Sequence, residues 1–168
     1  MLRKGRTIKA RPKRVLAIAS GGGHWVQLCR LIPAWDGCAT TYVTTNSGFR
    51  DAVEAVAEER GQAKPRFFAI VDANRYQKLS LALTFFRITW IILRTWPDVI
   101  ITTGAAPGGI AMFVGHRLGR RTVWIDSIAN PGELSMSGRL AEPYSTLWLT
   151  QWEHLAKPGG PEYRGSVL

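Results

Sequence analysis

The chain has few cysteines, and its amino terminus does not read as the apolar leader of a secreted protein. Only Cys29 and Cys38 occur among 168 residues, they form no CxxC pair, and the basic amino terminus lacks the apolar segment of a signal peptide. A disulfide framework is therefore not expected, and both thiols should pack in a reducing, cytoplasmic compartment. A zinc site built from His24, Cys29 and Cys38 matches no known ligand spacing, so no metal ion is expected.

Acidic residues are also few, with 12 Asp and Glu against 22 Lys and Arg and a formal net charge of +10. The excess is uneven, because residues 1–14 include seven basic residues and no acid. We therefore divide the chain into a basic N-terminal arm, residues 1–14, and one globular domain, residues 15–168. Such an arm can bind anionic lipid, nucleic acid or no specific partner. Since no aromatic-interleaved RNA motif is present, we expect an anionic membrane surface and not nucleic acid as its partner.

The usual nucleotide-binding fingerprints are missing. No GK[ST] tripeptide occurs, so the chain has no P-loop. A GxGxxG alignment that starts at Gly21 places Val26 where a third Gly or Ala is needed, and the segment around Thr45 has no acid for a ribose hydroxyl. NAD is therefore not expected, and no other cofactor is implied.

A glycine-rich turn is the most informative feature that is present. The apolar residues 15–19 predict a strand, residues 20–24 read Ser-Gly-Gly-Gly-His, and a helix is predicted to start near Trp25. Glycine is kept where the backbone needs positive φ or a close approach, and a helix N-terminus attracts anions. Residues 20–23 therefore predict a backbone cradle for phosphate or diphosphate with His24 at its lip. A plain tight turn is the alternative.

Short apolar strands alternate with helices along the rest of the chain. Strands are predicted at residues 15–19, 40–45, 66–71, 98–103, 121–126 and 145–151, and helices at 25–35, 49–60, 76–96 and 110–118. This alternation predicts an α/β fold with a single Rossmann-like, doubly wound parallel sheet in the order 3-2-1-4-5-6. The glycine-rich loops 20–24 and 104–109 would then face each other across the crevice where such sheets bind ligands.

Residues 79–96 are predicted to form a helix that is apolar on nearly all sides. Polar or charged side chains interrupt it at Ser80, Arg87 and Arg94. Two arginines make this stretch a poor transmembrane span. One interpretation is a buried crossover helix whose arginines reach solvent. The other is a helix that also enters the bilayer interface, with membrane contacts from Phe85, Phe86, Arg87, Trp90 and Arg94.

Several motifs resemble a known enzyme family. The turn at residues 20–24, with Pro97-Asp98-Val99 and Thr103-Gly104, is similar to the amino-terminal half of MurG-like GT-B glycosyltransferases. The carboxyl-terminal part resembles one subgroup more closely, in residues 126–129, 134–140, 151–155 and 162–165. The subgroup comprises the membrane-associated subunit of the two-subunit N-acetylglucosaminyltransferase of the dolichol pathway, and the PssD and CpsF proteins of bacterial exopolysaccharide and capsule assembly. Its eukaryotic members usually have an amino-terminal membrane helix, and tend to show Glu-Ser where this chain has Asp126-Ser127.

The resemblance implies a half-enzyme, since a GT-B transferase needs two Rossmann domains and this chain has room for one. A donor-binding partner subunit would hold the UDP-sugar. This chain would receive a polyprenyl-diphosphate-linked saccharide at the cytoplasmic face of the inner (plasma) membrane. Sugar transfer would then serve exopolysaccharide, capsule or lipid-linked oligosaccharide synthesis. The alternative is a non-catalytic membrane scaffold for a self-sufficient transferase.

Sugar transfer requires a base for the acceptor hydroxyl. His24 is the first candidate, because histidine titrates near neutrality, and a structural or phosphate-holding role is its alternative. Asp126 is the second candidate, with the cap of a helix or turn as the alternative. Acceptor and phosphate contacts are assigned to Ser20, Gly21, Gly22, Gly23, Gly104, Pro107 and Gly108. Gln151 and Trp152 are assigned to the partner interface or to the cleft floor.

Overall fold

The computed structural model describes residues 11–71 and 78–167, so most of the basic arm lies outside the described part. Within these ranges seven parallel strands form one sheet in the order β3-β2-β1-β4-β5-β6-β7. Their bounds are β1 Arg14–Ile18, β2 Ala39–Thr44, β3 Arg66–Ala69, β4 Val99–Thr102, β5 Arg121–Ile125, β6 Leu147–Thr150 and β7 Glu162–Tyr163. The predicted order of the first six strands is confirmed, and β7 adds an edge strand that the sequence did not suggest.

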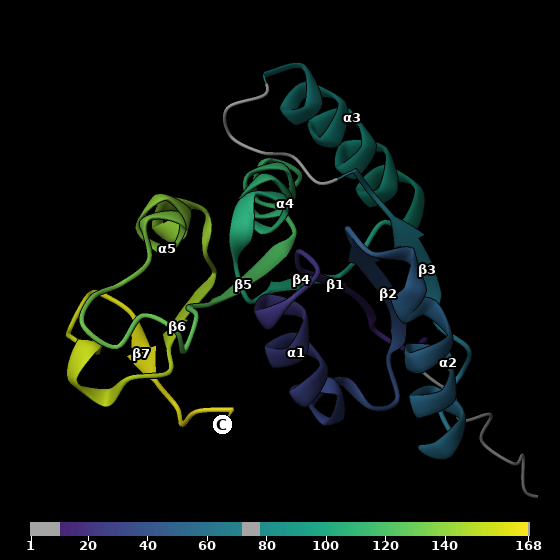
Figure 1. Ribbon diagram of the computed structural model, residues 1–168, viewed down its shortest axis with the longest axis horizontal. Helices are drawn as coiled ribbons and strands as arrows, with labels where there is room; N and C mark the ends of the chain where they lie inside the picture. The colour runs from purple at the N-terminus through teal and green to yellow at the C-terminus, as the bar shows by residue number, and fades with distance from the viewer. Residues whose placement is uncertain (1–10, 72–77, 168) are drawn as a thin grey trace, which may run out of the picture.

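Helices cover both faces of this sheet, with α1 and α2 on one side and α3 and α4 on the other (Figure 1). The helices are α1 Gly23–Arg30, α2 Arg50–Glu59, α3 Lys78–Thr95, α4 Ala105–Arg117 and α5 Met136–Ala141. Short 3-10 turns lie between these elements, at Ile32–Trp35, Ser47–Phe49, Glu142–Tyr144 and Glu153–Leu155. The doubly wound arrangement expected from the alternating pattern is therefore confirmed.

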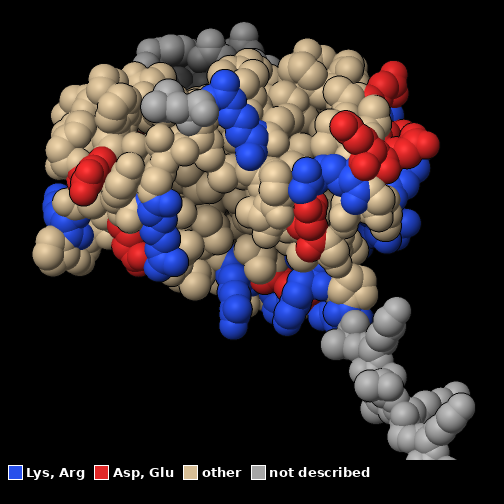
Figure 2. All heavy atoms as spheres, turned by 90° about the horizontal axis from the view of Figure 1, so that it is seen from below, with Lys and Arg blue, Asp and Glu red and all other residues tan. Residues whose placement is uncertain are grey.

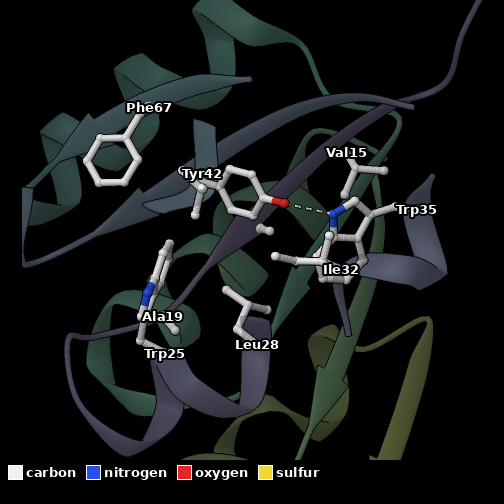
Figure 3. Packing of buried hydrophobic residues seen from close by; sticks show 10 residues of the cluster. Val15, Ala19, Trp25, Leu28, Ile32, Trp35, Tyr42 and Phe67 are labelled. Atoms are coloured by element: carbon white, nitrogen blue, oxygen red, sulfur yellow. Dashed lines mark hydrogen bonds between the residues drawn. The ribbon is translucent and has the colours of Figure 1, made fainter. Parts of the chain in front are cut away.

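Alternate residues of β1 enter two separate hydrophobic cores, as a strand buried on both faces requires. Val15, Ala17 and Ala19 pack with α1, whereas Leu16 and Ile18 pack with α3 and α4. The first core is rich in aromatic side chains (Figure 3), contributed by Trp25, Trp35, Tyr42 and Phe67. Burying this apolar area is the main source of stability for a sheet of this kind.

The same core explains the behaviour of two groups that could otherwise be reactive. The indole N–H of Trp35 donates a hydrogen bond to the Tyr42 hydroxyl at 3.1 Å (Figure 3). Burial raises the pKa of Tyr42 and raises the pKa of the Cys29 thiol to about 11. Cys29 is therefore a protonated thiol at neutral pH, in keeping with the packing role expected for it.

The prediction of a loop at residues 104–109 is wrong for residues 105–109, because these residues form the start of α4, which begins at Ala105. Pro107 lies in the first turn, where a missing N–H costs no intrahelical hydrogen bond. Gly108 is buried against β4, and a Cβ atom there would lie 2.2 Å from Oγ1 of Thr102. Helix–strand packing therefore accounts for Gly108, and only Gly104 remains of this loop.

Candidate functional site

Two helices begin side by side at the carboxyl edge of the sheet, because β1 and β4 are hydrogen-bonded neighbours. Gly22 precedes α1 with a φ of 112°, and Gly104 precedes α4 with a φ of 128°. Both angles lie in the region that side chains disfavour. The first N–H groups of each helix have no intrahelical acceptor, and the positive ends of two helix dipoles meet here. This arrangement suits an anion.

His24 ties the two turns together through a pair of reciprocal hydrogen bonds. Its Nδ1 lies 2.8 Å from the carbonyl oxygen of Thr103, and the Thr103 hydroxyl donates to the His24 carbonyl oxygen at 2.6 Å. The ring packs on Gly104, where a Cβ atom would lie 2.8 Å from the ring carbon Cε1. The absence of a side chain at Gly104 is therefore what allows the imidazole to join the start of α1 to the end of β4.

The contact with Thr103 also decides which His24 nitrogen can accept a proton. A carbonyl oxygen only accepts hydrogen bonds, so Nδ1 must carry the hydrogen atom. The neutral ring then has its lone pair on Nε2, which is the arrangement of a histidine held by one nitrogen and acting through the other. His24 is half-buried beside three exposed glycines, residues 21–23. The imidazole can thus meet a ligand at this edge.

Backbone geometry on both sides of His24 is held in place by neighbouring strands. The Gly21 N–H donates to the Thr45 hydroxyl at 2.8 Å, and half-buried Ser20 precedes it. On the other side Ala105 has a φ of 65°, a left-handed conformation that costs a non-glycine residue about 1–2 kcal/mol. Such strain persists where the surroundings impose it, and it is common at functional sites. No role was assigned from the sequence to Thr45 or Ala105, and Thr103 was noted only as part of a family motif.

Asp126 lies at the carboxyl end of β5 but is 2% exposed, and both of its oxygens already accept hydrogen bonds. Oδ2 accepts from the Ser135 N–H at 2.8 Å, and Oδ1 accepts from the Ser135 hydroxyl and from the Trp124 indole at 3.2 Å. Ser135 in turn caps α5 by accepting from the Gly138 N–H at 2.9 Å. These contacts favour the structural alternative, in which Asp126 holds Ser135, the residue that caps α5, and a role of Asp126 as a base stays a prediction.

Gln151 is the centre of a buried polar network and is 4% exposed. Its Nε2 donates to Oε1 of Gln27 at 2.7 Å and to the Asp126 carbonyl oxygen at 2.8 Å. Gln27 also donates to the Ser127 hydroxyl at 3.2 Å and accepts from the Ile128 N–H at 3.2 Å. This network joins α1 to the ends of β5 and β6. Its burial shows a structural role for Gln151, and the two roles expected for it, partner interface and cleft floor, stay predictions.

Trp152 is half-buried, and its indole N–H donates to the Ile128 carbonyl oxygen at 3.1 Å. Its ring also lies near His154, whose Nε2 donates to the carbonyl oxygen of Pro131 at 2.6 Å. Part of the Trp152 ring remains accessible, so an interface role for it stays a prediction. Gln27 and Ser127 were missed from the sequence because their partners lie about 100 residues away or more.

Helix α3 is apolar on two opposite faces. Its inner face buries Ile88, Ile91 and Ile92 against the sheet and α4. Its outer face exposes an apolar stripe, here called the α3 stripe, whose side chains are 46–76% exposed: Leu79, Leu83, Phe86, Trp90 and Leu93. The packed crossover helix is therefore seen, and entry of the exposed face into the bilayer interface stays a prediction.

The residues expected to contact a membrane are not all on the α3 stripe. Phe86 and Trp90 belong to it, and the Arg87 guanidinium stacks on the Trp90 ring at 4.9 Å. Arg94 is exposed in the last turn. Phe85 is half-buried and packs against Phe113 of α4 with ring centroids 6.4 Å apart. In the described part of the chain, no helix combines the length and the apolar character needed to cross a bilayer.

The chain matches no known protein-family profile. It is 28% identical over 178 residues to UDP-N-acetylglucosamine transferase subunit alg14 of Schizosaccharomyces pombe, covering 92% of this chain and 83% of that protein. It is 25% identical over 171 residues to the ALG14 subunit of Eremothecium gossypii, covering 87% of this chain and 75% of that protein.

The fold is also found in solved structures. MurG of Acinetobacter baumannii superposes with a TM-score of 0.69 at 12% identity, covering 90% of this chain and 45% of that one. A UDP-N-acetylglucosamine 2-epimerase of Rickettsia bellii superposes with a TM-score of 0.65 at 17% identity, covering 94% of this chain and 46% of that one. The chain thus spans slightly less than half the length of these proteins. It is similar along most of its length to subunits of UDP-N-acetylglucosamine transferases, and it has the Rossmann-like fold of the amino-terminal half of a GT-B glycosyltransferase.

Proposed function

We propose that this chain is one half of a two-subunit, UDP-sugar-dependent glycosyltransferase and binds its polyprenyl-diphosphate-linked acceptor. The observation that supports this best is the meeting of two helix N-termini at exposed glycines 21–23, bridged by His24. N–H groups and two helix dipoles suit a diphosphate better than a neutral ligand. The UDP-sugar would be held by a second, donor-binding chain, since the fold here is one half of a GT-B enzyme.

In this proposal His24 acts on the acceptor sugar. Its Nε2 removes the proton from the acceptor hydroxyl as the hydroxyl oxygen attacks the anomeric carbon of the donor. The bond from that carbon to the UDP oxygen breaks, and UDP leaves on the partner subunit. The Thr103 carbonyl oxygen holds the protonated ring through Nδ1–H. Exposed Gly21, Gly22 and Gly23 would receive the acceptor diphosphate beside the helix N-termini, with open space at Gly22 and Gly23, while Gly104 makes room for the His24 ring.

Membrane contact would come from the α3 stripe, with Arg87 and Arg94 placed to meet lipid phosphates. The basic arm would add a second, electrostatic anchor, although residues 1–10 lie outside the described part of the chain. One weak anchor gives marginal binding, and two together give stable attachment. The proposed location is the cytoplasmic face of the inner (plasma) membrane, where lipid-linked saccharides are extended for exopolysaccharide, capsule or lipid-linked oligosaccharide synthesis.

A paired substitution tests this membrane contact. Phe86→Ser removes an apolar side chain that is 69% exposed on the α3 stripe, and Leu140→Ser removes one that is 68% exposed on α5. We expect Phe86→Ser to weaken flotation with anionic vesicles by about 10-fold, because each buried apolar side chain is worth about 1.5–3 kcal/mol. Leu140→Ser should bind like the wild type. Equal binding by both variants would contradict the membrane role of α3.

Sugar transfer with purified components tests the proposed function itself. The chain alone should transfer no sugar from UDP-N-acetylglucosamine to a polyprenyl-diphosphate-linked saccharide, and addition of the donor-binding subunit should start the reaction. A donor-binding subunit that transfers sugar at full rate to a soluble acceptor analogue by itself would favour a membrane scaffold. A complex that transfers no sugar to any lipid-linked acceptor would contradict the proposal.

A further inference from the structure

A second polar region lies at the opposite edge of the sheet, where the strands begin. A pocket of about 250 Å³ opens between the amino ends of β1, β2 and β3 and the last turn of α3. Four cationic side chains line it, those of Arg14, Lys64, Arg66 and Arg94. Strands of four to six residues separate it from the glycine turns, which is roughly 13–20 Å at about 3.3 Å per residue. The pocket is therefore distinct from the proposed acceptor site.

Acidic side chains offset only part of the positive charge around this pocket. Asp98 pairs with Arg11 at 2.9 Å and accepts from the Arg14 backbone N–H at 2.9 Å. These contacts lower the pKa of Asp98 and keep it ionised. Glu54 pairs with Lys64 at 2.7 Å. Of the residues that the structure describes, none forms an ion pair with Arg66 or Arg94, and both side chains are exposed.

The surface view agrees with this distribution. Lys and Arg side chains gather along the lower margin of the molecule in Figure 2, with acidic side chains between them. One donor of the pocket is also incompletely satisfied. The Nε–H of Arg14 is inaccessible to solvent and has no hydrogen-bond acceptor within the described ranges, since the Asp98 carboxylate is 3.8 Å away. This donor is closed off from solvent, so an anion in the pocket would contact the exposed guanidinium groups of Arg66 and Arg94 instead.

We propose that this pocket is a second anion site, which binds the phosphate of an anionic lipid head group. Guanidinium groups match phosphate oxygens with parallel N–H donors, and Arg66 and Arg94 have donors available for it. Arg94 directly follows Leu93, the last residue of the α3 stripe, so the pocket continues the apolar surface proposed to enter the bilayer. The inference rests on the membrane contact proposed above and not on sugar transfer.

A head group held at this edge would do more than add affinity. The α3 stripe alone allows the molecule to roll about the axis of the helix. A phosphate bound at the end of α3 gives a second fixed point and sets the angle of the sheet to the membrane. That angle decides how far the opposite edge, with His24, stands from lipid-linked acceptors.

The test compares two double variants of the full-length chain that remove the same charge. Arg66→Gln/Arg94→Gln alters the pocket, and Arg139→Gln/Arg164→Gln alters exposed arginines on α5 and near β7. Each is mixed with phosphatidylcholine vesicles with and without phosphatidylglycerol, and separately titrated with inorganic phosphate. We expect the pocket variant to lose about 10-fold or more in affinity for the phosphatidylglycerol vesicles, and the control to stay within about twofold of the wild type.

The other outcomes overturn the proposal in distinguishable ways. Loss of inorganic phosphate binding with unchanged vesicle binding would mean that the pocket holds free phosphate and no lipid. Pocket and control variants that behave alike with both probes would mean that no anion site exists there. If Phe86→Ser still weakens vesicle binding in that case, the membrane contact of α3 stands and only the second anion site is lost.

Discussion

Two corners of the carboxyl edge of the sheet differ in whether their polar groups are exposed or buried and hydrogen-bonded. Beyond β1 and β4, three exposed glycines and the N-termini of α1 and α4 leave N–H groups without intrahelical partners. Beyond β5 and β6, three polar side chains are nearly inaccessible to solvent: Asp126, Gln151 and Gln27. The Gln151 amide donates to Gln27 and to the Asp126 carbonyl oxygen, and the Asp126 carboxylate accepts from the Ser135 N–H. The polar groups of the first corner are exposed and suit the proposed ligand, whereas those of the second are bonded within the fold.

This difference separates the residues proposed to take part in sugar transfer from the residues that stabilise the fold. The Gln27 side chain belongs to α1, three residues after His24, and anchors that helix to the β5 and β6 ends. The closed corner thus fixes the helix whose N-terminus forms part of the open corner. Substitutions in the two corners should consequently have different signatures, one in sugar transfer and the other in stability.

The largest effect is expected from His24→Ala in the open corner. Loss of a general base typically reduces the rate by 10²–10⁴-fold, and we expect sugar transfer by the complex to fall by about that factor. The free energy of unfolding should change by only about 1 kcal/mol, because the ring makes a single hydrogen bond through Nδ1. A fully active His24→Ala complex would remove the base assignment.

In the closed corner, Asp126→Ala should act on stability. It leaves the Ser135 N–H and the Trp124 indole without their acceptor in a buried site, which should cost about 2–4 kcal/mol of unfolding free energy. Asp126→Asn should cost less and keep the rate of transfer per folded molecule, as chemical unfolding and kinetics can establish. A rate loss of 10²-fold or more in a stable Asp126→Asn protein would restore Asp126 as a catalytic group.

A matched pair of glycine substitutions tests the contact between the two turns. Gly104→Ala places a Cβ atom against the His24 ring, whereas Gly119→Ala at the end of α4 meets open space. Both residues have positive φ, 128° and 67°, and Gly119→Ala should lose about 1 kcal/mol of stability. Gly104→Ala should lose more, because its ψ of −162° lies in a region essentially restricted to glycine and its Cβ atom would lie 2.8 Å from the His24 ring. We expect only Gly104→Ala to lose transfer, by about 10-fold. Equal transfer by the two variants would mean that the position of His24 does not matter.

The smallest expected effect is that of Gln27→Met. This substitution keeps the volume of the side chain and removes Oε1, the acceptor of the Ile128 N–H at 3.2 Å and of the Gln151 amide at 2.7 Å. The unfolding free energy should fall by about 1–2 kcal/mol, with a modest rise in the mobility of α1 that hydrogen exchange can detect. An unchanged exchange rate in α1 would show that the network does not anchor the helix.

The sequence was sufficient for the architecture because buried parallel strands leave a strong signal. Runs such as residues 15–19 are apolar without interruption, and the order of six strands followed from right-handed crossovers. β7 was missed because Glu162 and Tyr163 are two exposed residues with no apolar run. The start of α4 was missed because Gly104, Pro107 and Gly108 resemble a loop, although proline is well tolerated in a first helical turn.

The candidate site was only partly predictable. The glycine turn and His24 could be found because a few consecutive residues are enough to recognise a turn between a strand and a helix. The predicted strand order then placed Gly104 beside them. The bond from His24 to Thr103 spans 79 residues, and the bond from Gln151 to Gln27 spans 124. Asp126 is buried, and nothing in residues 126–129 distinguishes a buried carboxylate from an exposed one. Contacts of this kind depend on the folded arrangement.

Binding of a soluble prenyl diphosphate tests most directly whether the two helix N-termini hold the acceptor. Titration of the full-length chain with farnesyl diphosphate should show saturable binding. Gly104→Ala should weaken this binding by about 10-fold, and Gly119→Ala should leave it unchanged. Equal affinity in all three proteins, or no saturable binding by the wild type, would contradict a diphosphate site at this edge of the sheet.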